Sequence, residues 1–264
     1  MHCVVLGTID KFYMGVSNMA RIKADYIDHM GSDLRVVNSA RVSFDKESEW
    51  LPSSLHSECP SVSHQYQDDN VVCLSEKDVK LINYLAKHNH WTPFAHCVVT
   101  LRETVPIFIA RQRTTSSVGF VFNEISRRYV DSAPEFFKPQ YWRERSAEKK
   151  QGSTSKKIDV LNDGCSVDEE YSSLLAKTLD LYVRSIEAGV CPEQARMLLP
   201  QSMMTSYYVT GSLAAFARVY KLRIAEHAQE EIKELARRWN EILSVLFPVS
   251  WEALTCSSLS GNRT

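Results

Sequence analysis

The sequence lacks the features that mark several classes of protein. Its seven cysteines include no C-x-x-C pair, so their spacing suggests no zinc site, and an odd number does not suit a disulfide framework. We therefore expect reduced thiols and a cytoplasmic location. The apolar run Val105–Ala110 is far shorter than the ~20 residues of a membrane helix, so we expect no membrane partner. The N-terminal residues have no basic region followed by a long apolar one, so no signal peptide is expected.

The chain also lacks an excess of charge of either sign. It has 31 Lys and Arg against 32 Asp and Glu, a net charge of −1. A protein held to nucleic acid mainly by phosphate neutralisation is strongly basic, so we expect no nucleic-acid partner. With 9 Gly and 9 Pro, the composition excludes a collagen-like or low-complexity chain. What remains is a globular protein of ordinary composition, 44% hydrophobic and 24% charged.

The predicted elements place strands early and helices late. Cys3–Leu6 is a short apolar run that could form an edge strand, and the Val- and Thr-rich segment Cys97–Val105 is typical of a strand. Pro106 sits where a helix could begin, and Met203–Thr210 is again β-like. Because strands and helices do not alternate as βαβ units, we expect an α+β fold. Its mixed or antiparallel sheet would be flanked by helices, with a helical C-terminal half.

Several segments carry helix-start signals. Ser75 and Ser166 each begin a capping-box-like pattern followed by apolar residues at helical spacing, which stop near Lys87 and at Gly189. Ser212 could cap a further helix. We expect two more helices, a short one from Pro192 that ends before Pro200, and a last one whose apolar residues run from Ile224 to Leu246.

Two segments show no sustained pattern. Residues 45–75 are interpreted as a loop or insertion, and residues 144–165, rich in Lys, Ser, Gly and Asp, as a solvated loop that could be locally disordered. The sequence has no internal repeat. We therefore expect a single domain over residues 1–264 with loop insertions near 45–75 and 144–165.

The densest polar cluster follows the predicted helix start at Pro106. It runs over Arg111–Ser117 and Asn123–Tyr129, and it holds four arginines, several hydroxyls and one carboxylate. Guanidinium groups bind phosphate oxygens in a bidentate manner, and hydroxyls add donors. The cluster therefore indicates a phosphorylated small molecule as ligand, although a solvated loop with local ion pairs has the same composition.

Arg223 lies in an apolar pattern and is expected to point inward. A buried arginine must find an anion or several acceptors. The alternatives are a ligand and a structural pair with an acid such as Glu226 or Glu230. Arg196, between apolar neighbours, presents the same choice. The residues that share the predicted helical stripe, at steps of four, three and four, are Phe216, Tyr220, Arg223 and His227.

Three histidines, His88, His90 and His96, lie close together in the sequence. Their spacing fits no helical zinc pair, and no acid or cysteine joins them at ligand spacing, so no metal site is expected. We expect instead a turn in which His90 and Thr92 touch a ligand.

Six blocks of the sequence are spread over most of the chain: Ala40–Phe44, Lys87–His96, Pro106–Gln112, Asn123–Tyr129, Ala195–Pro200 and Leu222–Ile232. These blocks, in this order, resemble the flavin-dependent thymidylate synthases. The resemblance implies the α+β fold of that family.

The resemblance implies an enzyme that makes dTMP from dUMP. In this family methylenetetrahydrofolate supplies the one-carbon unit, and FAD reduced by NADPH supplies the hydride. The family also implies a homotetramer whose active sites form at subunit interfaces. Because the flavin carries the difficult step, no protein nucleophile is expected, and no cysteine is nominated. Ser126 is interpreted as a phosphate or ring contact, since no base is evident beside it.

The resemblance also assigns roles to individual residues. Arg223 matches the arginine that lies against the uracil, where a cation favours the ionised ring and makes C5 a better nucleophile. It is the one catalytic residue that we nominate. The positions that match dUMP contacts are Gln112, Glu124, Ser126, Arg127, Arg128, Arg196 and Arg223. The positions expected to contact FAD are His90, Thr92, Arg113, Glu124, Ser212, Leu213, Ala214 and Arg218.

One departure from the family falls at its Arg-His-Arg signature. In one register Arg111–Arg113 stands for that triplet and Val118–Phe122 is an insertion. In the other, which upstream continuity slightly favours, Ala110–Gln112 matches the preceding Ala-Arg-Gln and the triplet is largely lost. Arg218 also stands where some relatives have Asn. Because the triplet contacts flavin, two alternatives stay open: a methylase or hydroxymethylase of UMP or another pyrimidine nucleotide, and a nucleotide-binding homologue without catalysis.

Overall fold

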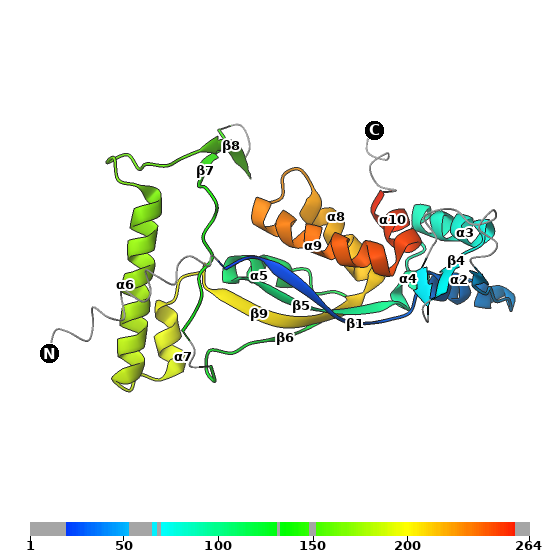
Figure 1. The fold of residues 1–264 in the computed structure, drawn as a ribbon, viewed down its shortest axis with the longest axis horizontal. Helices are drawn as coiled ribbons and strands as arrows, with labels where there is room; N and C mark the ends of the chain where they lie inside the picture. Colours follow the sequence, from blue (N-terminus) through cyan, green and yellow to red (C-terminus); the bar gives the residue numbers. More distant parts are fainter. Residues whose placement is uncertain (1–19, 53–64, 68–69, 131–132, 148–151, 257–264) are drawn as a thin grey trace. The chain divides into compact units, whose positions relative to one another are not determined.

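The structure is a computed structural model of the chain, and it describes residues 20–52, 65–67, 70–130, 133–147 and 152–256. Its central feature is a four-stranded sheet in the order β1-β5-β9-β6 (Figure 1). These strands are β1 (Lys23–Met30), β5 (Val98–Pro106), β9 (Met204–Ser212) and β6 (Phe120–Glu124). In the sequence, helices lie between these strands, and three more helices follow β9. The predicted α+β fold with a helical C-terminal half is therefore confirmed.

The chain divides into two compact units, each assembled from separate stretches. The first unit contains residues 104–115 and 124–207 together with the start of the described chain up to Lys23. The second contains residues 24–103, 116–123 and the residues from Tyr208 onward.

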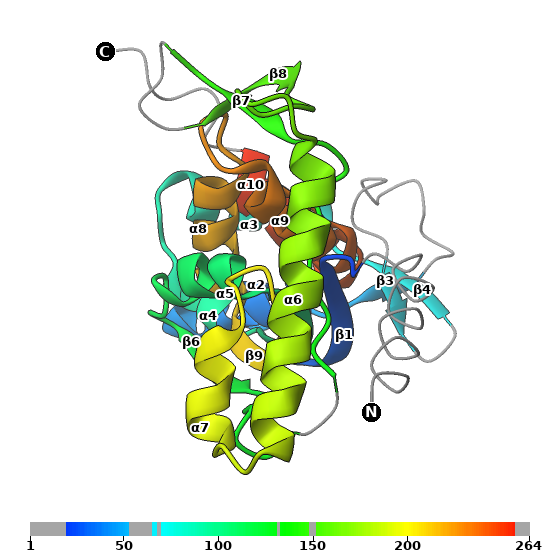
Figure 2. The same cartoon turned by 90° about the vertical axis from the view of Figure 1, so that its left-hand side faces the viewer.

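In the first unit a long helix, α6 (Val167–Glu187), packs against α7 (Pro192–Ala195) and the 3₁₀ turn η4 (Arg196–Leu198) (Figure 2). The hydroxyl of Ser166 accepts a hydrogen bond from the Glu169 amide at 3.3 Å, so the predicted cap is confirmed. The Tyr171 hydroxyl donates to the Phe137 carbonyl at 2.7 Å, which ties α6 to the chain before it. This unit also contains α5 (Ile107–Thr114), which begins directly after Pro106 as expected.

The second unit packs helices around a core that includes Phe216 and Trp239. Its helices are α2 (Asp33–Arg41), α3 (Glu76–Lys87), α4 (Thr92–Ala95), α8 (Leu213–Ile224), α9 (Glu230–Leu246) and α10 (Pro248–Cys256), with the 3₁₀ turn η1 (Val42–Phe44) after α2. The indole nitrogen of Trp239 donates to the buried Glu103 carboxylate at 2.9 Å. The Asp33 carboxylate accepts from the amides of Val249 and Ser250 at 2.9 and 3.0 Å, which joins the start of α2 to the start of α10.

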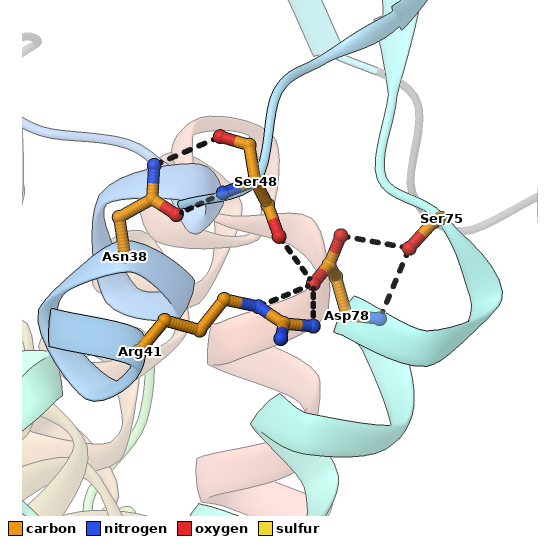
Figure 3. Close-up of polar contacts among 5 residues, drawn as sticks. All are labelled: Asn38, Arg41, Ser48, Ser75 and Asp78. Atoms are coloured by element: carbon orange, nitrogen blue, oxygen red, sulfur yellow. Dashed lines mark hydrogen bonds and ion pairs between the residues drawn. The ribbon is translucent and has the colours of Figure 1, made fainter. Parts of the chain in front are cut away.

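Asp78, at the start of α3, is the centre of a polar network that links α2 to α3 (Figure 3). The Arg41 guanidinium donates to its carboxylate at 2.6 Å, and the hydroxyls of Ser48 and Ser75 donate at 2.9 and 2.7 Å. The Asn38 side chain in turn holds Ser48 through two hydrogen bonds to its main chain. Arg41 belongs to the first of the six sequence blocks, so this block has a structural role here.

Both segments predicted as loops contain short strands. Within residues 45–75, β2 (Leu51–Pro52), β4 (Asn70–Cys73) and β3 (Gln65–Gln67) form an antiparallel sheet in the order β2-β4-β3. Within residues 144–165, β7 (Arg143–Arg145) pairs with β8 (Ser153–Lys157) as a hairpin. The loop predictions were wrong for these residues because strands of two to five residues are too short to show a sustained apolar alternation, and their polar side chains have low strand propensity.

The predicted last helix is divided. Helix α8 ends at Ile224, Ala225 has an extended ψ of 150°, and α9 begins only at Glu230. Apolar residues keep a helical spacing across this break, so periodicity alone could not reveal it. Helix α10 was not predicted at all. The predicted strand at Cys3–Leu6 lies outside the described residues.

Among the described cysteines, Cys73 departs from the expectation of reduced thiols. Cys73 is disulfide-bonded, whereas Cys97, Cys165, Cys191 and Cys256 are free. Cys97 is buried, and this burial raises the pKa of its thiol to about 12. The cytoplasmic location stays a prediction. Within the described part of the chain, no helix is both long and apolar enough to cross a membrane.

Candidate active site

The end of β6 and the turn after it carry the middle of the expected nucleotide site. Glu124 is the last residue of β6, and its carboxylate accepts a 2.5 Å hydrogen bond from the buried hydroxyl of Thr205 on β9. The Ile125 amide donates to the Ser206 carbonyl at 2.9 Å, so the chain stays attached to β9 beyond the strand. These two bonds fix where the carboxylate of Glu124 lies.

The turn at residues 126–129 places a hydroxyl beside a guanidinium. The Tyr129 amide donates to the Ser126 carbonyl at 3.0 Å and closes the turn. The main-chain amide and Nε of Arg128 donate to the Ser126 hydroxyl at 3.4 and 3.5 Å. The Arg128 guanidinium also lies 5.1 Å from the centre of the Tyr129 ring. A turn of this kind offers several donors to an anion.

Arg128 and Arg196 both contact Glu193 on α7. Its carboxylate lies 3.6 Å from Nη1 of Arg128, and its main-chain carbonyl accepts from Nε of Arg196 at 3.3 Å. Both guanidiniums are solvent-exposed, so Arg196 does not point inward as its apolar neighbours suggested. Two exposed cations around one residue suit the binding of a phosphate group.

Helix α5 holds the two expected residues that belong to the altered signature. Gln112 is half-buried, and Arg113 has no exposed surface. The helix runs through Arg113 to Thr114, so this arginine is part of a regular helix. Its guanidinium is enclosed by protein, and its expected contact with flavin stays a prediction.

The expected flavin residues of the second unit gather around the start of α8. The Ser212 hydroxyl accepts from the Ala215 amide at 3.2 Å, so the predicted cap is confirmed. The Leu213 amide donates to the Cys97 carbonyl at 2.9 Å, and α4 packs against α8. The structure therefore brings the Thr92 turn and the Ser212–Ala214 segment into the same neighbourhood.

His90 and Thr92 are exposed at the start of this turn, beside other rings. The ring of Tyr84 lies 4.3 Å from that of His88 and 6.1 Å from that of His90, measured between centres. Asn89 adopts a left-handed conformation with φ of 56°, which lets the chain turn sharply after α3. Among the described residues, no group of three or more His, Cys, Asp or Glu could hold a metal ion.

Arg223 is half-buried in the last turn of α8. Its Nη2 donates to the Ser116 hydroxyl at 3.1 Å. His227 lies beyond the end of α8, so the predicted stripe of four residues on one helix is wrong at its last member.

The sequence did not reveal three partners of site residues, namely Ser116, Thr205 and Glu193. The contact between Arg223 and Ser116 joins positions 107 residues apart, and the contact between Thr205 and Glu124 joins positions 81 residues apart. No local pattern links residues at such distances.

The chemistry of the donor groups in the second unit fits a flavin. Two hydroxyls (Thr92 and Ser212), one imidazole (His90) and one exposed guanidinium (Arg218) lie on α4, α8 and the residues just before them. Hydroxyls and ring nitrogens bind the polar edge of an isoalloxazine ring, and a guanidinium binds phosphate. Helix α8 has twelve residues, so its N-terminal end also favours negative charge.

Comparison with known proteins identifies the family. A family model described as "Thymidylate synthase complementing protein" matches residues 25–249. A flavin-dependent thymidylate synthase of Thermus thermophilus is 32% identical over 242 residues, covering 89% of this chain and 76% of the relative. The chain belongs to the flavin-dependent thymidylate synthase family. The expectation drawn from the six blocks is confirmed, and so is that of a flavin-dependent enzyme.

Other relatives agree with this assignment to the flavin-dependent thymidylate synthases. The enzyme of that name from Thermosipho africanus is 31% identical over 236 residues, covering 89% of this chain and 92% of the relative. Among solved structures, the UMP/dUMP methylase PolB from Streptomyces cacaoi bound with 5-Br dUMP superimposes with a TM-score of 0.68 at 26% identity. That match covers 90% of this chain and 96% of the other, and the complex with 5-Br UMP gives a TM-score of 0.66 at 25% identity.

Proposed function

We propose that this protein converts dUMP to dTMP, with methylenetetrahydrofolate as the carbon donor and NADPH as the reductant of bound FAD. The observation that carries the proposal is the placement of Arg128 and Arg196 around Glu193, next to the turn that follows Glu124. Both arginines lie in family blocks, and exposed guanidiniums at such a position suit a nucleotide phosphate. The proposed assembly is a homotetramer with active sites at subunit interfaces.

Each of the chain's own groups has a defined task in this proposal. Arg128 and Arg196 neutralise the phosphate, while Gln112, Ser126 and the main chain around Arg127 orient the nucleotide. Arg223 places a fixed positive charge against the pyrimidine, which stabilises negative charge on the ring and raises electron density at C5. C5 of the ring would then bond to the one-carbon unit while the bond between that carbon and the folate breaks, and no protein nucleophile would take part.

The second unit supplies the residues proposed to hold the flavin. Thr92, His90, the Ser212–Ala214 segment and Arg218 would contact it, together with Glu124, whose carboxylate Thr205 keeps in place. Once held there, the flavin would supply the hydride. The protein's part is to hold the nucleotide in position for the reaction.

An absorption spectrum and a tritium-release assay test this proposal. The purified protein should be yellow, and with NADPH and methylenetetrahydrofolate it should release tritium from dUMP labelled at C5. A colourless protein that stays inactive with added FAD would contradict the proposal. Tight dUMP binding without flavin binding would instead indicate a non-catalytic nucleotide-binding protein, whereas rescue of a thymidine-requiring strain would exclude that alternative.

A second candidate keeps the chemistry and changes the nucleotide. The altered signature and the likeness to a UMP/dUMP methylase favour a methylase or hydroxymethylase of UMP or a related nucleotide. Side-by-side turnover of dUMP and UMP decides between the two candidates. A strong preference for dUMP removes the second.

A further inference from the structure

Residues Ser116–Phe120, the segment in which the sequence departs from the family's signature, pack closely on α8. The Phe120 amide donates to the Ser117 carbonyl at 2.9 Å and closes a turn. Gly119 has a φ of 82°, and a Cβ at this position would lie 2.8 Å from Cβ of Ala215 on α8. The segment therefore approaches the helix more closely than any residue with a side chain could.

An aromatic contact fixes the end of the segment. The Phe120 ring meets the Phe216 ring edge-on, with centres 4.9 Å apart. A Cβ at Gly211 would lie 2.3 Å from the Phe120 ring, so the glycine before Ser212 leaves the space that this ring occupies. The Phe120 ring thus packs against the first turn of α8, near the residues expected to contact flavin.

Two arginines of α8 bind the polar groups of the same segment. Arg218 donates through Nη2 to the main-chain carbonyl of Val118 at 2.6 Å, and Arg223 donates through Nη2 to the Ser116 hydroxyl at 3.1 Å. Val118 is 77% exposed, and its main-chain carbonyl is the group that contacts the helix. Arg218 and the altered signature, which both depart from the family, therefore contact each other directly.

This arrangement lets Arg218 act on Arg223 through the chain. Ser116 and Val118 are two residues apart, so fixing the Val118 carbonyl restricts where the Ser116 hydroxyl lies. A hydrogen bond from a guanidinium is strong and directional because the donor is charged and the fork is planar. Without the bond at Val118, the segment keeps its aromatic contact at Phe120 but loses its polar anchor next to Ser116.

We propose that Arg218 is a positioning residue for Arg223, acting through the Val118 carbonyl and the Ser116 hydroxyl. The segment would then orient the guanidinium that faces the nucleotide ring. This inference rests on the proposed function, because it takes the role of Arg223 from there. It predicts that Arg218 and Ser116 act on the same step of nucleotide turnover.

The test combines Arg218→Ala, Ser116→Ala and the double variant, with Arg238→Ala as the control. Arg238 is an exposed helical arginine whose guanidinium pairs with Glu241 on α9. With FAD at saturating concentration, each single variant should lower kcat/KM for dUMP roughly tenfold, while the control stays at the wild-type value. The double variant should be no worse than the more damaged single variant, because both changes release the same guanidinium.

Amide hydrogen exchange measures the anchor without any substrate. In Arg218→Ala the Phe120 amide should exchange about tenfold faster than in the wild type, with the melting temperature unchanged. Unchanged exchange would show that the Arg218 contact does not hold the segment. Additive losses in the double variant, or full recovery of Arg218→Ala at saturating FAD, would show that Arg218 acts on flavin instead. A wild type inactive on dUMP would defeat the proposed function while leaving the exchange result to decide on the anchor.

Discussion

At the scale of single residues, Arg223 is the group on which the proposed chemistry depends most. Arg223→Lys keeps the positive charge but replaces a planar fork with a point charge. We expect kcat with dUMP to fall about 100-fold, because charge stabilisation on the ring depends on fixed donor geometry. Steady-state kinetics and thermal unfolding measure the two effects. Arg238→Lys serves as the matched control, and unchanged turnover in Arg223→Lys would show that its role is misassigned.

Thr205 is a second residue whose effect can be measured, through Glu124. Its buried hydroxyl donates a 2.5 Å bond to the Glu124 carboxylate. Thr205→Val keeps the shape and removes the donor, so Glu124 should lose its fixed position. We expect KM for dUMP to rise about fivefold to tenfold with little change in melting temperature. Thr205→Ser retains the hydroxyl and should behave like the wild type, and equal behaviour of the Val and Ser variants would contradict this expectation.

Asp33 makes stability depend on pH. Burial raises the pKa of its carboxyl to about 6, although hydrogen bonds from Ser250 and Val249 act in the opposite direction. The folded protein thus binds this proton more tightly than the unfolded chain does. The stabilisation is full below about pH 4 and is lost as the pH rises through about 6, and a shift of this size corresponds to about 3 kcal/mol.

Asp33→Asn isolates that dependence because the amide keeps an acceptor oxygen but does not titrate. Urea unfolding at pH 4.5 and pH 7.5 gives the free energy of unfolding of both proteins. We expect the wild type to lose more stability than the variant between the two pH values. An equal loss in both would show that the Asp33 carboxyl has an ordinary pKa in the folded state.

At the scale of elements, the Asp78 network joins α2 to α3 through hydrogen bonds to the buried carboxylate of that residue. The Asp78 side chain is 4% exposed and accepts from Arg41, Ser48 and Ser75. Asp78→Ala would leave the Arg41 guanidinium without this buried acceptor. We expect a loss of about 3 kcal/mol in the free energy of unfolding, measured by chemical denaturation.

A neighbouring ion pair provides the contrast for that measurement. Glu76 pairs with Lys80 one turn along α3 at 2.7 Å, and both side chains are exposed. Glu76→Ala removes an ion pair from the same helix, and solvent screening should leave stability nearly unchanged. Similar losses for Asp78→Ala and Glu76→Ala would mean that the buried network contributes nothing specific.

The elements that sequence predicted correctly are those fixed by neighbouring residues. Ser75, Ser166 and Ser212 all cap helices through their own hydroxyls, as their spacing indicated. The pairing of Leu51 with Cys73 involves residues 22 positions apart, and no local signal announces it. The sequence also did not reveal the break between α8 and α9, because the apolar residues keep their helical spacing across the five residues that separate the two helices.

The candidate site shows the same division. The blocks Asn123–Tyr129 and Lys87–His96 are continuous in sequence, so their residues could be named before the structure was known. The contacts that orient them come from elsewhere in the chain, as in the bonds from Thr205 to Glu124 and from Arg223 to Ser116. Such contacts depend on tertiary packing, which composition and periodicity do not encode.

At the scale of the whole molecule, the two expected ligand sets separate between the compact units. The dUMP set belongs to the first unit except for Arg223, and the FAD set belongs to the second except for Arg113 and Glu124. Arg223 therefore shares a unit with the flavin residues. Substitution of a proposed dUMP-binding residue of the first unit, as in Arg196→Ala, should weaken dUMP binding and leave the absorbance of bound flavin unchanged.

The proposed interface active site can be tested by mixing two variants of strongly reduced activity, Arg196→Ala and Arg223→Lys, at a dUMP concentration that leaves each nearly inactive on its own. If one protomer supplies Arg196 and its partner supplies Arg223, a mixed oligomer contains some sites with both native arginines. Random mixing in equal amounts should then restore about a quarter of wild-type activity, because each contribution is native in half of the protomers. If both residues come from one protomer, no site regains both, and the mixture stays inactive. Subunit exchange is confirmed first with differently tagged chains, so that an inactive mixture counts against the shared site and not against mixing.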